Sequence, residues 1–192
     1  LKVEEGETYG LRGLKLVVEI SESNLHRRDW KYIRELITRT PFKEDLRERI
    51  LKVFRLLAEA EASVHGCDAD QVHFHELGSI DAIVDVVGVC AAIDYLNPKK
   101  IFCSNPPVGH GNVKTSHGIL PVPAPVVLEL ARRNQINLVG GQDYPEGELT
   151  TPTGLALIAV LADSFGQPSS LGDSATGIGL GIDFALHMVL LL

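Results

Sequence analysis

Apolar side chains recur along this chain with two different periods, and each period predicts a kind of element. Between residues 11 and 20, Leu14, Leu16 and Val18 stand at every second position, which is the period of a strand. From residue 30 the spacing changes to three and four and predicts one helix after Asp29 and a second that ends at Gly66. The apolar positions of these helices are Trp30, Ile33, Leu36, Ile37, Leu46, Ile50, Phe54, Leu57 and Val64.

The rest of the chain predicts further helices and strands around two unusual loops. Residues 80–96 are apolar nearly all round, which is typical of a helix buried on most faces. We expect further helices over 126–133 and 155–165, strands over 101–104, 136–139 and 186–192, and a flexible glycine turn over 177–181. Residues 105–125, rich in Gly and Pro, and residues 146–154 are long loops of the kind that is often functional. The pattern indicates an α/β (or α+β) fold, with a mixed sheet and several packed helices in a single compact domain.

Composition and charge narrow the classes of partner. The net charge of −7 disfavours nucleic acids and anionic membranes, because both bind clustered Lys and Arg. No apolar run approaches the roughly 18 residues that span a membrane. The three cysteines, Cys67, Cys90 and Cys103, form no CxxC motif, and no signal peptide is visible, so we expect a cytoplasmic protein. The chain starts at Leu1 and ends in three leucines, which we interpret as a fragment.

Residues 72–75 are a candidate metal-binding strand. If this stretch is extended, its side chains alternate, so that Val72 and Phe74 face a core while His73 and His75 share the other face. Two imidazoles on one face can point at a single ion, and imidazole suits nickel, zinc, copper and iron. The alternative is an ordinary pair of surface histidines.

Three carboxylates follow these histidines. Ser79 is placed to cap a helix that starts at residue 80, and on that helix Asp81 and Asp85 lie four apart on one face. Together with Glu76, they could complete a metal site or accept hydrogen bonds from its imidazoles. Asp81 alone is equally explained by stabilisation of the helix N-terminus. Asp85 stands among valines, where a partly buried carboxylate needs a partner.

The two loops carry further candidate chemistry. His110, between Gly109 and Gly111, could approach a ligand closely, and Lys114 could meet a phosphate, although exposed histidines and a solvated lysine explain the same residues. His117 follows in the same loop. The second loop places hydroxyl groups before a helix start, which is either an anion site or an ordinary N-cap. Its candidates are Glu148, Thr150, Thr151, Thr153 and Gly154.

Three stretches together resemble the nickel-insertion protein of the lactate-racemase cofactor pathway, the LarC family. They read VHFHELGSID at 72–81, GHGNVKTSHGILPVPAP at 109–125 and EGELTTPTG at 146–154. Their order and spacing match the family pattern, and the likeness covers roughly residues 10–192, the N-terminal part of the family protein. Only His26 stands near 21–28, where family members often carry a histidine-rich tract.

The resemblance implies a metal-inserting enzyme of the lyase class, a cyclometallase. Such proteins insert Ni(II) into pyridinium-3,5-bisthiocarboxylic acid mononucleotide and form a pincer nucleotide with a metal–carbon bond. The family reaction consumes CTP with Mn(II) or Mg(II), and CTP binds a further C-terminal domain. Residues 1–192 would then be an N-terminal nickel-insertion region, with apo-lactate racemase as a candidate partner and room for a homo-oligomer.

We assign roles from residue chemistry on this basis. The candidate metal ligands are His73, His75, Glu76 and His110. The candidate catalytic residues are Glu76, Asp81, Asp85 and His117. The candidate substrate-binding residues are Gly109, Gly111, Lys114, Glu148, Thr150, Thr151, Thr153 and Gly154. Two alternatives use the same residues: a nickel storage or delivery module without catalysis, and a zinc- or manganese-dependent hydrolase that activates water.

Overall fold

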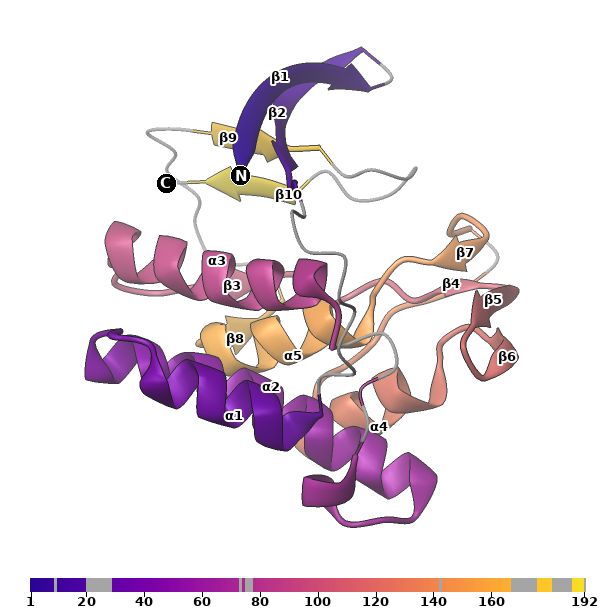
Figure 1. Cartoon of the computed structure of the whole chain (residues 1–192). Helices are drawn as coiled ribbons and strands as arrows, with labels where there is room; N and C mark the ends of the chain where they lie inside the picture. Colours follow the sequence, from indigo (N-terminus) through magenta and orange to yellow (C-terminus); the bar gives the residue numbers. More distant parts are fainter. Residues whose placement is uncertain are drawn as a thin grey trace. The chain divides into compact units, whose positions relative to one another are not determined.

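The chain divides into two compact units. The computed structural model describes residues 1–8, 10–19, 29–72, 74, 78–141, 143–166, 176–180 and 188–191. One unit combines Leu1–Leu25 with Pro168–Leu192, and the other is His26–Gln167 (Figure 1). We expected a single domain from the sequence. The difference arises because the two terminal segments pair with each other as strands, and no local pattern reveals such a long-range contact.

The terminal unit is a mixed four-stranded sheet. Its strands β1 (Lys2–Thr8), β2 (Leu11–Val17), β9 (Thr176–Gly179) and β10 (Met188–Leu191) lie in the order β1-β2-β9-β10. β2 pairs antiparallel with β1 and parallel with β9, where Leu14 faces Gly179. The mixed sheet and the strand at β2 confirm the prediction, but the expected turn after residue 176 is a strand. A Cβ at Gly13 would lie 2.7 Å from the carbonyl oxygen of Ile178, so glycine allows β2 and β9 to approach.

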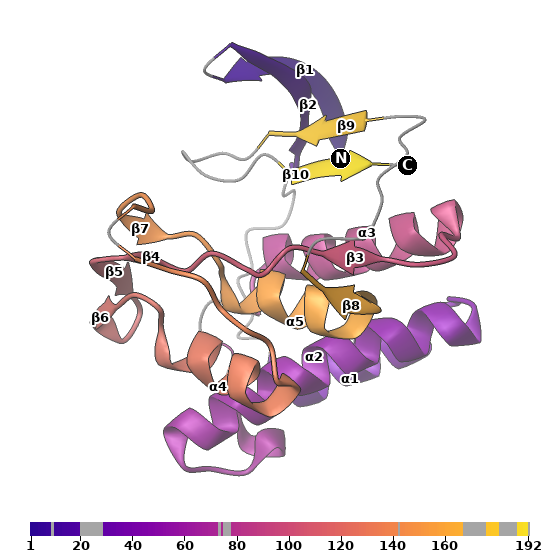
Figure 2. The same cartoon turned by 180° about the vertical axis from the view of Figure 1, so that it is seen from behind.

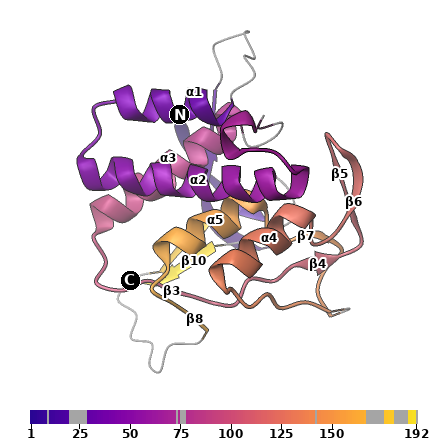
Figure 3. The same ribbon diagram turned by 90° about the horizontal axis from the view of Figure 1, so that it is seen from below.

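The described residues of the central unit form five α-helices arranged around α2. They are α1 (Trp30–Arg39), α2 (Glu44–His65), α3 (Ile80–Leu96), α4 (Pro125–Asn134) and α5 (Pro152–Leu161), with a short 3₁₀ turn at Ala69–Gln71. The helix α2 contacts the other four, and Figure 3 shows it between α1 and the pair α4 and α5. Ile50, Val53, Phe54 and Leu57 of α2 are fully buried. This helix therefore organises the core, and its predicted apolar stripe is buried except at Val64, which is exposed.

Helix ends follow the capping signals in the sequence. The Asp29 carboxylate accepts a hydrogen bond from the Tyr32 amide at 2.7 Å, and the Ser79 hydroxyl accepts one from the Ala82 amide at 3.1 Å. Gly66 ends α2 with a φ of 67°. These three predictions are confirmed, and they fix the bounds of α1, α2 and α3.

Other expectations about this unit were wrong. Only Ala82, Val86 and Cys90 of α3 are buried, so this helix packs along one narrow face instead of most of its surface. The helix α5 covers 152–161 rather than 155–165, because Pro152 starts it early and the chain then turns into β8 (Ser164–Phe165). β8 pairs in parallel with the expected strand β3 (Phe102–Cys103). Residues 136–139 contribute only one bridge, between Pro107 and Val139.

The Gly- and Pro-rich stretch at 105–125 contains more regular structure than a loop. It holds β4 (Gly109–His110) and a hairpin of β5 (Asn112–Thr115) and β6 (Gly118–Pro121). β4 pairs with β7 (Gly147–Glu148), so the two motif-bearing stretches lie side by side (Figure 2). Among the described residues, no helix combines the length and apolar character that crossing a membrane requires.

Candidate functional site

A cleft of about 310 Å³ lies where α2 ends, between the β5–β6 hairpin and the start of α5. This volume is at the lower end of the range for small-molecule sites, roughly 300–1,000 Å³. Apolar side chains from α2, the hairpin and α4 form part of its wall. Its polar and charged lining residues are Glu61, His65, Lys114, Thr115, Ser116, His117 and Glu148. The cleft therefore unites three residues predicted from the two loops, namely Lys114, His117 and Glu148.

The hairpin turn presents His117 to the cleft. The Thr115 hydroxyl donates to the carbonyl oxygen of Gly118 at 3.1 Å and accepts from the His117 amide at 3.1 Å. Gly118 has a φ of 98°, a value that suits glycine. Both bonds close the turn around His117 and fix the backbone from which its side chain extends.

A second histidine lies beside His117. The ring centroids of His65 and His117 are 4.9 Å apart, with the rings tilted by 45°. The Nε2 atom of His65 also lies 3.3 Å from Oε2 of Glu61, one turn earlier on α2. Two imidazoles and a carboxylate thus meet at one end of the cleft, which is an arrangement suited to holding and moving protons.

The strand pair β4–β7 fixes the two loops against each other. Gly109 has a φ of 72°, and a Cβ there would lie 2.1 Å from the carbonyl oxygen of Gly147. Thr150 is buried, and its hydroxyl donates to the carbonyl oxygen of Pro107 at 2.5 Å. A Cβ at Gly111 would lie 3.0 Å from the Glu146 side chain. Close packing between the loops accounts for these three residues, and their substrate contacts stay a prediction.

The start of α5 closes the cleft on one side. Thr151 is the N-cap, and its hydroxyl accepts from the Gly154 amide at 3.2 Å, as the capping alternative predicted. Pro152 occupies the first turn and lines the cleft. Pro152 has no amide hydrogen and the Gly154 amide is bonded to Thr151, so the attraction of this helix start for an anion comes from the partial positive charge of the helix dipole. Roles for Thr153 and Gly154 in substrate binding are not decided by these contacts.

Comparison with known proteins decides the family. A sequence model of the family described as "Nickel insertion protein" matches residues 1–188. The chain belongs to the nickel insertion protein family. It is 41% identical over 181 residues to a "Putative nickel insertion protein" of Geobacter sp. (strain M21), covering 94% of this chain and 46% of that protein. A protein of the same name from Synechococcus elongatus is 42% identical over 172 residues, covering 90% and 42%.

One relative has a more specific name. The "Pyridinium-3,5-bisthiocarboxylic acid mononucleotide nickel insertion protein" of Nocardioides sp. is 40% identical over 184 residues, covering 94% of this chain and 45% of that protein. The chain thus spans about half the length of the curated relatives it matches. No solved structure matches the chain.

Most of the predicted nickel ligands are not part of the described structure. His73, His75 and Glu76 lie outside the described residues, as does His26. Their neighbours Val72 and Phe74 are only 2% and 5% exposed, which confirms that these two alternate positions face a core. His110, on β4, is exposed. Among residues 1–8, 10–19, 29–72, 74, 78–141, 143–166, 176–180 and 188–191, no group of three or more His, Cys, Asp or Glu side chains could hold a metal ion.

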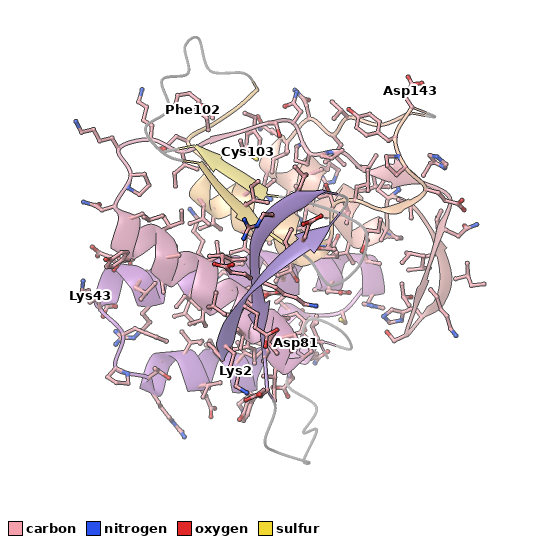
Figure 4. The ribbon with its side chains drawn as sticks, turned by 90° about the horizontal axis from the view of Figure 1, so that it is seen from above. Lys2, Lys43, Asp81, Phe102, Cys103 and Asp143 are labelled. Carbon is pink, nitrogen blue, oxygen red and sulfur yellow. The ribbon has the colours of Figure 1, made fainter. Side chains whose placement is uncertain are left out.

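The predicted catalytic aspartates lie on α3. Asp81 is at the N-terminal end of this helix (Figure 4), and both Asp81 and Asp85 are exposed. Partial desolvation, and then the charge of Asp81, raise the pKa of Asp85. We expected Asp85 to be partly buried with a partner, but the helix leaves it on the surface because α3 buries only one narrow face. Neither aspartate is among the residues that line the cleft.

Sequence reasoning missed Glu61 and His65. The sequence analysis gave His65 no role beyond its place at the end of a helix, because no neighbouring residue indicates a binding or catalytic function. The spacing of four between a carboxylate and a histidine on a predicted helix was the available signal. This spacing indicates a candidate site only once the hairpin is known to bring His117 beside His65.

Proposed function

We propose that this chain takes part in inserting nickel into pyridinium-3,5-bisthiocarboxylic acid mononucleotide, the compound in the name of the Nocardioides relative. The observation that supports this most directly is the cleft, which unites charged residues of the second and third family motifs at one place. We further propose that the product is the nickel-pincer cofactor of lactate racemase, whose apoprotein would receive it. The resemblance also implies CTP with Mn(II) or Mg(II) in a further C-terminal domain, and a cytoplasmic location.

The charges around the cleft suit such a nucleotide. The substrate combines a cationic pyridinium ring with an anionic phosphate and two thioacids. Lys114 and the first turn of α5 offer positive charge for the phosphate, and Glu61 and Glu148 offer negative charge for the ring. Apolar contacts from Val64, Val113, Leu120, Ala124 and Val126 would cover the ring face. A site with both signs of charge distinguishes this substrate from a simple anion.

The chemical step needs a base. When Ni(II) replaces the ring hydrogen between the thioacids, the C–H bond breaks and its electron pair forms the Ni–C bond. The proton must leave, while nickel stays divalent, so no oxidant or reductant is required. We assign the proton to His117, because this residue lines the cleft and the hairpin turn fixes its backbone.

Delivery of nickel to the cleft is assigned to the stretch before α3. His73, His75 and Glu76 are our proposed ligands, with His110 as a further donor from β4. The burial of Val72 and Phe74 supports this assignment, since residues that alternate with buried positions face away from the core. Imidazole is a common ligand for nickel.

Calorimetric titration of the mononucleotide into the protein tests the cleft. We expect binding by the wild type and roughly tenfold weaker binding by Lys114→Ala, because a charge-assisted contact to phosphate is lost. Lys52→Ala is the control, since Lys52 is an exposed lysine on α2 that does not line the cleft. Equal loss in both variants would contradict the assignment of Lys114.

Two other results would favour a different function for this chain. Nickel binding without any mononucleotide binding would support the storage or delivery module. Metal-dependent release of acid or phosphate from generic esters would support the hydrolase.

A further inference from the structure

Glu61 and His65 lie one turn apart on α2 and both line the cleft. The carboxylate of Glu61 is well covered, with a side-chain exposure of 16%, and it lies 3.3 Å from Nε2 of His65. The imidazole of His65 is more open, at 39%. A covered carboxylate at this distance restrains the histidine beside it, because the contact and the spacing on the helix favour the same orientation.

His65 in turn contacts His117 from a different element. The two rings, with centroids 4.9 Å apart, join the end of α2 to the turn of the β5–β6 hairpin. The other charged residues that line this cleft are Lys114, from β5, and Glu148, from β7. His117 therefore has the His65 ring at its side and carboxylates contributed by two elements to the same cleft.

We propose that Glu61 and His65 are positioning residues for His117 in the nickel-insertion step. Glu61 holds His65, and the His65 ring holds the His117 imidazole at the place where it accepts the proton of the substrate ring. The Glu61 carboxylate also offsets the positive charge that His117 acquires. The assignment rests on the proposed function, and it concerns residues of α2 outside the three family motifs.

The test compares the wild type and four variants of the full-length protein in mononucleotide binding and in nickel insertion. Glu61→Gln keeps the shape of the side chain and removes its charge. We expect its kcat to fall about tenfold to 100-fold, because the base is misplaced by a small distance, while binding of the mononucleotide changes less than about twofold. Glu61→Asp retains the charge and should recover part of the rate.

Glu59→Gln is the matched control. Glu59 lies on the same helix and pairs with Arg133 at 3.7 Å, but it does not line the cleft. We expect its kcat to equal that of the wild type. His65→Gln should lower kcat as Glu61→Gln does, since both variants remove the restraint on the His117 imidazole.

The outcomes distinguish a failure of the positioning role from a failure of the proposed function. If Glu61→Gln and His65→Gln insert nickel at the wild-type rate, the positioning role is wrong and the proposed function stands. If Glu59→Gln loses as much as Glu61→Gln, or Glu61→Asp recovers nothing, the effect is structural and the positioning role is again overturned. If the wild type neither binds the mononucleotide nor inserts nickel, the proposed function itself fails.

Discussion

Helices α2 and α3 of the central unit each carry a pair of ionisable residues at a spacing of four, and these two pairs differ in their surroundings. On α2, Glu61 and His65 line a cleft and meet His117 from the hairpin. On α3, Asp81 and Asp85 are exposed at the helix start, and partial desolvation, followed by the charge of Asp81, raises the pKa of Asp85. The spacing makes a pair in both cases. Only the pair on α2 becomes part of a candidate site, because a third group, His117, reaches it from a distant segment.

The strongest test of this comparison sets His117→Asn against Asp85→Asn. We expect His117→Asn to slow nickel insertion about 100-fold or more, because general-base catalysis typically contributes that much. Asp85→Asn should cost less, since Asp85 does not line the cleft. Rates are measured with saturating mononucleotide and nickel. An equal or larger loss in Asp85→Asn would move the base from the cleft to α3.

The frame of the cleft is tested at two glycines that both have positive φ. Gly109→Ala places a Cβ 2.1 Å from the carbonyl oxygen of Gly147, whereas Gly118→Ala meets nothing within 4 Å. We expect Gly118→Ala to lower the free energy of unfolding by about 1 kcal/mol through backbone strain alone. Gly109→Ala should cost about 3 kcal/mol, because β4 and β7 must also separate. Urea denaturation measures both, and equal losses would show that the close approach of these strands is not needed.

Capping residues in the two regions provide a smaller comparison. Thr151→Ala and Ser79→Ala each remove a hydroxyl that accepts a helix amide, so each should lower the free energy of unfolding by about 1 kcal/mol. Only Thr151→Ala should also weaken binding of the mononucleotide, because α5 starts at the cleft and α3 does not. Thermal unfolding and calorimetry separate the two effects. Weaker nucleotide binding in Ser79→Ala would place part of the substrate near α3.

The smallest expected effect concerns the aspartate pair itself. A carboxyl whose pKa is raised in the folded state makes the protein less stable as the pH rises from the ordinary aspartate range through the raised value. Asp81→Asn removes one cause of the raised pKa, so the pKa of Asp85 should fall and this loss of stability should become smaller. Carboxyl ¹³C NMR follows the titration of Asp85. An unchanged midpoint would leave desolvation as the whole cause.

Sequence reasoning succeeded where the physical cause is local. The caps at Asp29 and Ser79 and the C-terminal glycine of α2 act within one turn, so neighbouring residues were enough to place them. It failed at β9, which pairs with the distant strand β2, and at β1, which pairs with the neighbouring strand β2 but lacks an apolar alternation. The charged residues of β1 and the glycines of β9 interrupt the alternating apolar pattern from which strands are predicted.

The candidate site was predicted in part for the same reason. The composition of the two loops predicted a functional role, and Lys114, His117 and Glu148 do line one cleft. The contribution of α2 could not be found, because the contact between His65 and His117 joins residues far apart in the chain. The nickel ligands proposed at 73–76 stay a prediction.

The pairing of β2 with β9 has a consequence for how the protein is made. Leu14 leaves the ribosome long before its partner Gly179 does, and at typical synthesis rates the delay is roughly 10 to 30 s. Throughout this interval β1 and β2 can form their hairpin, but the outer side of β2 has no strand to pair with. Such an open edge can recruit strands from other nascent chains. Production of this protein should therefore depend on chaperones that shield the open edge of β2 until β9 has been synthesised.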